Sequence, residues 1–87
     1  MITKDIEIQN SVGLHARAAS YFVQKASEYS SSIWVEMGDA KVNAKSWMGV
    51  LAMGISKGDV ITLIAEGADE EAAVDGLVAF ILGGFNE

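Results

Sequence analysis

A chain of 87 residues is long enough for one small domain, and a composition with 51% hydrophobic and 21% charged residues favours a single compact domain over residues 1–87. Twelve acidic residues against six basic ones give a net charge of -6, which disfavours binding to nucleic acid or to an anionic membrane. No cysteine, signal-peptide pattern or apolar run of about 20 residues is present, so we expect a cytoplasmic protein without disulfides, thiolate metal sites or membrane insertion.

The first half of the chain predicts a strand, a helix and a hairpin. Alternating apolar residues predict a strand over 2–8, with Ile6 and Ile8 facing the core. After a turn at 10–13, a helix is expected from residue 16 to about residue 29, with one apolar face made of Ala19, Phe22, Val23 and Ala26. Alternation over 33–37 predicts a second strand, and the glycine and aspartate at 38–39 predict a tight turn into a short strand around Val42.

The second half predicts a short helix, a strand and a longer helix. The apolar stretch 46–53 has a serine at its start and a glycine just beyond its end, as a capped helix does. The β-branched stretch 60–65 suits a central strand. A last helix begins at three acidic residues, 69–71, whose charges favour its positive end. It is expected to end at the glycines 83–84 and to bury Ala73, Leu77, Phe80 and Ile81.

The order of these elements is β-α-β-β-α-β-α, which indicates the α+β class. We expect an open-faced β-sandwich, in which a four-stranded, mostly antiparallel sheet carries all three helices on one face. The other face of the sheet would be open to solvent.

His15 and Arg17 stand two positions apart, where the predicted turn leads into the first helix. They are the only histidine and the only arginine of the chain. The first turn of a helix leaves backbone N–H groups without partners, and its dipole favours an anion. An imidazole at this place is a nucleophile that titrates near neutral pH. A phosphoryl group attached to it would lie among free amides, with a guanidinium close enough to bind its oxygens.

The spacing alone leaves a simpler interpretation open, because a histidine beside a helix start is often an ordinary surface residue. A metal site is disfavoured, since a single histidine without cysteine would need several carboxylates and none lies nearby in the sequence. A hydrolytic triad of the usual kind is disfavoured as well, because there is no second histidine and no cysteine.

Several segments resemble one known family. The segment 13–19, GLHARAA, is similar to the active-site signature of the HPr family, the histidine-containing phosphocarriers of the bacterial sugar phosphotransferase system. The similarity continues in FVQ at 22–24, VNAKSWMGV at 42–50, GISKGD at 54–59 and AEGADE at 65–70. These motifs lie in the same order over nearly the whole chain, at the length that is typical of the family.

The resemblance implies a carrier and not an enzyme. His15 would accept a phosphoryl group on Nδ1 from phosphorylated enzyme I, which is itself charged by phosphoenolpyruvate, and would donate it to the IIA domains of sugar-specific enzymes II. Arg17 would stabilise the phosphoryl group during transfer. No cofactor or metal is implied, and we expect a monomer.

Ser46 begins the short helix, and its simplest interpretation is a helix N-cap. The resemblance adds a second one, because KSWMGV at 45–50 is similar to the regulatory segment of Gram-positive members. In those proteins an ATP-dependent kinase phosphorylates the matching serine. Phosphorylated Ser46 would then hinder the charging of His15 and favour binding to a catabolite-control transcription factor.

A docking patch is predicted around this helix, since Trp47, Met48 and Leu51 cannot all point inward from so short an element. Ala16 and Ala19 would complete the patch, because small side chains beside His15 leave the site open to a partner. The alternative is that Trp47 and Leu51, or else Val50 and Met48, close the core.

The chain departs from the family at two positions near the histidine. Ala18 replaces the usual proline, and Val12 stands where a small polar residue is common. Two rival functions stay open. One is an HPr-like catabolite-repression regulator that acts through Ser46 without sugar-transport duty, although such relatives typically lack the histidine. The other is a small-molecule-binding regulatory domain, which leaves the placement of His15 and Arg17 unexplained.

Overall fold

The computed structural model describes residues 1–9 and 16–85. Its elements are β1 (Ile2–Glu7), α1 (Ala16–Ala26), β2 (Ser32–Met37), β3 (Ala40–Asn43), α2 (Trp47–Ala52), β4 (Val60–Glu66) and α3 (Glu70–Leu82). This order confirms the predicted β-α-β-β-α-β-α arrangement. α1 is shorter than expected, because it ends at Ala26 and the chain then turns toward β2 through residues 27–31. No helix within the described ranges is long and apolar enough to cross a bilayer.

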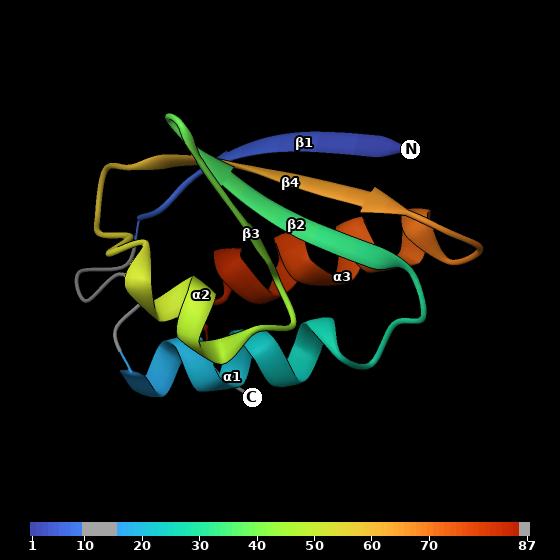
Figure 1. Ribbon diagram of the computed structural model, residues 1–87, viewed down its shortest axis with the longest axis horizontal. Helices are drawn as coiled ribbons and strands as arrows, with labels where there is room; N and C mark the ends of the chain where they lie inside the picture. The colour runs from blue at the N-terminus through green and yellow to red at the C-terminus, as the bar shows by residue number, and fades with distance from the viewer. Residues whose placement is uncertain (10–15, 86–87) are drawn as a thin grey trace.

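The four strands form one sheet in the order β1-β4-β2-β3, and each pair of neighbours is antiparallel. All three helices lie on one side of this sheet, which confirms the open-faced sandwich (Figure 1). The register places Ile6 opposite Ile61 and Val35 opposite Leu63. These four side chains are buried. Because strand side chains alternate between faces, the residues between them point to the open face.

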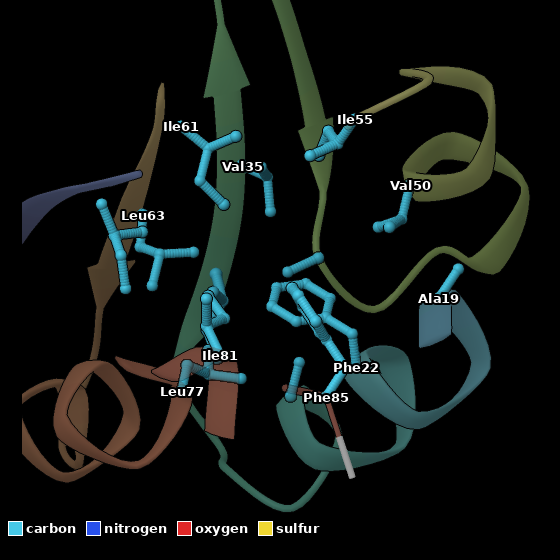
Figure 2. Packing of buried hydrophobic residues seen from close by; sticks show 14 of the residues in the cluster. Ala19, Phe22, Val35, Val50, Ile55, Ile61, Leu63, Leu77, Ile81 and Phe85 are labelled. Carbon is cyan, nitrogen blue, oxygen red and sulfur yellow. The ribbon is translucent and has the colours of Figure 1, made fainter. Parts of the chain in front are cut away.

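The core lies between the sheet and the helices (Figure 2). Phe22 of α1 is fully buried and packs against Phe85, with ring centroids 6.2 Å apart. The buried stripe of α3 differs slightly from the predicted one, since it consists of Ala73, Val74, Leu77 and Ile81. Phe80 lies beside that stripe and is only half-buried, with its ring edge-on to Phe85 at 5.9 Å.

An aromatic residue that follows the end of α3 packs into the core. The helix ends before Gly83 and Gly84, as predicted. Phe85 then adopts a positive φ of 64°, and its N–H donates to the carbonyl of Phe80 at 3.1 Å. This conformation is unfavourable for a residue with a side chain, but it leaves Phe85 only 1% exposed. Burial of a phenylalanine offsets the backbone cost.

Asp69 ties the start of α3 to the segment between α1 and β2. Its carboxylate accepts hydrogen bonds from the backbone N–H groups of Ser30 and Ser31, both at 2.9 Å, and from the hydroxyl of Ser31. These donors favour the charged form, so they lower the pKa of Asp69 from 3.8 to about 2. The hydrogen bond from the N–H of Gly67 likewise lowers the pKa of Glu70.

The lowered pKa of Asp69 predicts an acid-dependent loss of stability. Because folding depresses this pKa, the contribution of Asp69 is complete above its ordinary value of 3.8 and is lost as the pH falls toward 2. Urea unfolding of the parent and of Asp69→Asn should therefore differ at pH 6 and converge near pH 2. The exposed Glu71 supplies the control, since Glu71→Gln should unfold like the parent at both pH values. A constant difference between the parent and Asp69→Asn would contradict this assignment.

Candidate functional site

The predicted phosphoryl site begins where α1 begins. Ala16 and Arg17 are the first two residues of this helix, and both are exposed. The first turn contains no acidic side chain, so nothing in it opposes an anion. Ala18, one of the two departures from the family pattern, is buried. His15 and Val12 lie outside the described residues, and what was predicted for them stays a prediction.

Arg17 contacts Tyr21, one helical turn further along α1. Its Nε donates a hydrogen bond to the hydroxyl of Tyr21 at 3.2 Å, and its guanidinium carbon lies 5.8 Å from the centroid of the ring. This hydrogen bond raises the pKa of Arg17 above its ordinary value. The guanidinium therefore stays charged at every pH at which the protein is folded.

Ser46 caps α2, as the sequence predicted. Its side-chain oxygen accepts a hydrogen bond from the N–H of Gly49 at 3.2 Å, which satisfies one of the free amides of the first turn. Gly49 leaves room for this contact, because a Cβ there would lie 3.2 Å from the Oγ of Ser46 and 3.3 Å from the Cβ of Val42. Ser46 is exposed, so its hydroxyl can be reached by another protein.

Removing the cap should weaken the fold modestly. We expect Ser46→Ala to lower the free energy of unfolding by about 1 kcal/mol, because the N–H of Gly49 loses its acceptor. Ser46→Asp keeps a good capping oxygen and should retain the stability of the parent. Chemical denaturation of the three proteins measures both differences. Equal losses in Ser46→Ala and Ser46→Asp would show that the capping oxygen contributes nothing.

The predicted docking patch lies largely on the surface. Trp47 is 40% exposed and Met48 is 72% exposed, whereas Leu51 is half-buried against the core. Val50 is the residue of α2 that fills the core instead. The alternative in which Trp47 closes the core is therefore wrong. Ala16 is exposed at the neighbouring start of α1, and α1 packs against α2.

Ala19 does not belong to that patch. It has no exposed surface and points from α1 toward α2, which packs against that helix (Figure 2). Its small side chain suits this close packing of two helices. The burial of Ala19 argues against a docking role for it, and the predicted docking patch is left with Ala16, Trp47, Met48 and Leu51.

The fold separates the charges in a way that the sequence analysis did not use. Residues 8–27 and 40–58, which include α1 and α2, contain no acidic residue. The same two segments hold five of the six basic residues, namely Arg17, Lys25, Lys41, Lys45 and Lys57. Lys41, however, lies over Trp34 on the open face of the sheet, and Lys25 is paired with Glu28. These two lysines therefore add no net positive charge beside Arg17 and Ser46. Across the described ranges, no three His, Cys, Asp or Glu side chains gather closely enough to hold a metal ion.

Comparison with known proteins agrees with this geometry. The sequence model of the family described as PTS HPr component phosphorylation site matches residues 2–82. The HPr-like protein Crh of Halalkalibacterium halodurans is 47% identical over 81 residues, which cover 93% of this chain and 96% of that protein. The phosphocarrier protein HPr of Neisseria meningitidis is 46% identical over 87 residues, covering 100% of this chain and 98% of that protein.

A solved structure has the same fold throughout. The crystal structure of HPr from Thermoanaerobacter tengcongensis is 54% identical and superimposes with a TM-score of 0.95, covering 100% of this chain and 98% of that one. The family match, the sequence identity and the shared fold each cover more than nine tenths of the chain. The chain therefore belongs to the HPr family of phosphocarrier proteins.

Proposed function

We propose that this chain is a cytoplasmic, monomeric phosphoryl carrier that accepts a phosphoryl group on His15 from phosphorylated enzyme I and donates it to IIA domains during sugar uptake. In the accepting step, a lone pair on Nδ1 of the neutral imidazole forms a bond to phosphorus. The bond between phosphorus and its donor on enzyme I breaks, and that electron pair stays with the donor. Donation to a IIA domain reverses these roles. The chain itself releases no product and is regenerated by its partners.

The observation that carries the proposal is the charged, exposed Arg17 at the start of α1, two positions after the only histidine. His15 is bonded directly to Ala16, the first residue of the helix, so the free amides and the positive end of α1 are close along the chain. Arg17 adds a guanidinium, whose planar fork of donors suits phosphoryl oxygens. Both groups stabilise negative charge, which is what a transferring phosphoryl group carries.

The docking patch and the charge separation support a protein partner at the same place. Trp47 and Met48 offer exposed apolar surface, and polarisable or aromatic side chains of this kind are common at interfaces. The charge of Arg17, together with the absence of acidic residues from 8–27 and 40–58, favours partners with an acidic active-site surface, because opposite charges speed the encounter of two proteins. We propose that enzyme I and the IIA domains dock here in turn.

Phosphorylation by a known donor tests the proposal. The purified chain is incubated with phosphoenolpyruvate and a bacterial enzyme I, and its intact mass is measured before and after brief acid treatment. We expect one phosphoryl group that is lost in acid, as a phosphohistidine is. A chain that stays unmodified, beside an enzyme I that charges a known carrier in the same buffer, would refute the carrier function.

We also propose that Ser46 is a regulatory phosphorylation site for an ATP-dependent kinase. Its hydroxyl is exposed, and its place at the start of α2 puts a new phosphate next to Trp47 and Met48. Two added negative charges there would weaken docking of an acidic partner, so charging of His15 would slow. The same change would create a surface for a catabolite-control transcription factor.

The second candidate function is a catabolite-repression regulator that works through Ser46 alone. It is favoured by the similarity to a relative named HPr-like protein Crh, which matches this chain about as well as a named phosphocarrier does. The presence of His15 favours the carrier. The two functions differ in the assay above, since a pure regulator would take phosphate from a serine kinase and none from enzyme I.

A further inference from the structure

Two pairs of a basic residue and a tyrosine with the same spacing begin on α1, although Tyr29 of the second pair lies three residues beyond the end of that helix. Arg17 lies over Tyr21, and eight residues later Lys25 lies over Tyr29, with the charged group 5.8 Å from the ring centroid in both pairs. Residues four apart face each other on a helix, and the later side chain leans back toward the earlier one. The two pairs therefore form from local geometry.

The pairs differ in what else holds the cation. Lys25 also forms an ion pair with Glu28 at 3.3 Å, so a carboxylate compensates its charge. In the part of the chain that the structure describes, Arg17 has no acidic partner, and its hydrogen bond goes to the neutral hydroxyl of Tyr21. A carboxylate would compete with a phosphoryl group for the guanidinium. A hydroxyl holds the guanidinium in place and leaves its charge uncompensated.

The atom that Tyr21 holds is the inner nitrogen of the guanidinium. Nε donates to the tyrosine hydroxyl, whereas the four N–H donors on the two Nη atoms have no partner among the described residues. An arginine offers two edges for paired hydrogen bonds, and the edge formed by the two Nη atoms does not need Nε. The contact with Tyr21 and a two-point contact with phosphoryl oxygens can therefore exist at the same time.

We propose that Tyr21 is a positioning residue for phosphoryl transfer, which holds Arg17 by Nε and by its ring so that the Nη edge binds the phosphoryl oxygens. This inference rests on the proposed function, because it takes His15 as the phosphoryl acceptor. Ordering a long side chain costs conformational free energy. Because Tyr21 already holds Arg17 in the free protein, this cost does not fall on the transfer step. Without Tyr21, an exposed arginine would be ordered only during transfer.

A double-mutant cycle tests whether Tyr21 acts through Arg17. The rate constant and KM for charging by enzyme I are measured for the parent, Tyr21→Leu, Arg17→Ala and the double variant. Tyr21→Leu should lower the rate constant about two- to tenfold with little change in KM, the range expected for ordering one side chain. In the Arg17→Ala background the same substitution should have almost no effect. Tyr21→Phe keeps the ring and loses the hydroxyl, so its rate constant should lie between those of the parent and Tyr21→Leu.

Tyr29→Phe is the matched control, because it removes a tyrosine hydroxyl from the other cation–tyrosine pair and should leave charging unchanged. Circular dichroism and thermal unfolding check that each variant is folded. Equal effects of Tyr21→Leu with and without Arg17 would overturn the positioning role and leave the carrier function intact. A parent chain that takes no phosphate from enzyme I would overturn the carrier function, and the positioning role with it.

Discussion

Replacing His15 by alanine should abolish charging by enzyme I. The chain has one histidine, so this substitution leaves no other imidazole that could form an acid-labile phosphoramidate. The loss should therefore be complete, with no increase in intact mass after prolonged incubation with phosphoenolpyruvate and enzyme I. Arg17 would still be present, but it carries no lone pair for attack at phosphorus.

Ser46→Ala is the matched control for this experiment. It removes a hydroxyl at the second predicted phosphorylation site and leaves the histidine in place. This variant should still gain one acid-labile phosphoryl group from enzyme I. Its loss of about 1 kcal/mol in capping leaves the domain folded. An acid-labile phosphoryl group on His15→Ala would place the acceptor elsewhere in the chain.

Phe22→Ala should cause the largest loss of stability among the substitutions considered. Phe22 is fully buried on the core face of α1, where it packs on the equally inaccessible Phe85. Removing the ring costs its transfer free energy and leaves a cavity, together about 3–5 kcal/mol. A domain of this size has about 4–13 kcal/mol in all, at roughly 0.05–0.15 kcal/mol per residue. The substitution therefore removes a large part of the total stability.

Urea denaturation followed by circular dichroism measures this loss. The midpoint should fall strongly for Phe22→Ala, with an unfolding temperature lower by roughly 20 °C. Met48→Ala truncates an apolar side chain that is 72% exposed, and it should change the free energy of unfolding by no more than about 0.5 kcal/mol. If the two variants were equally stable, the core described around Phe22 would be wrong.

The sequence predicted the strands and helices well because apolar residues recur with a different period in each. Alternation with a period of two identified β1 and β2, and the helical spacing of Ala19, Phe22 and Ala26 identified α1. The cap at Ser46 could also be predicted, because it depends only on residues within one turn of the helix. The contact between Arg17 and Tyr21 is also local, and its spacing of four residues was a signal that the sequence analysis did not use.

Other features depend on which elements the fold brings together. The spacing of Ala19 with Phe22 and Ala26 already placed it on the apolar face of α1, whereas the contact between α1 and α2 could be known only from the structure. Phe85 follows the end of α3, where no periodicity remains to indicate that the chain turns back into the core. The sequence predicts for Asp69 only the role of an acidic residue at the start of a helix. Its pKa nevertheless depends on Ser31 and Ser30, which lie 38 and 39 residues away.

By itself, then, the sequence determined the order of strands and helices, the family, and the identity of His15, Arg17 and Ser46 as candidate site residues. These follow from patterns within a few residues, where bonded geometry limits the choices. The tertiary structure alone decided which surfaces remain for partners: it leaves Trp47 and Met48 outside and brings α1 and α2, two helices without acidic residues, into contact. The physical reason is that burial and electrostatic potential depend on packing between distant segments, which no local pattern specifies.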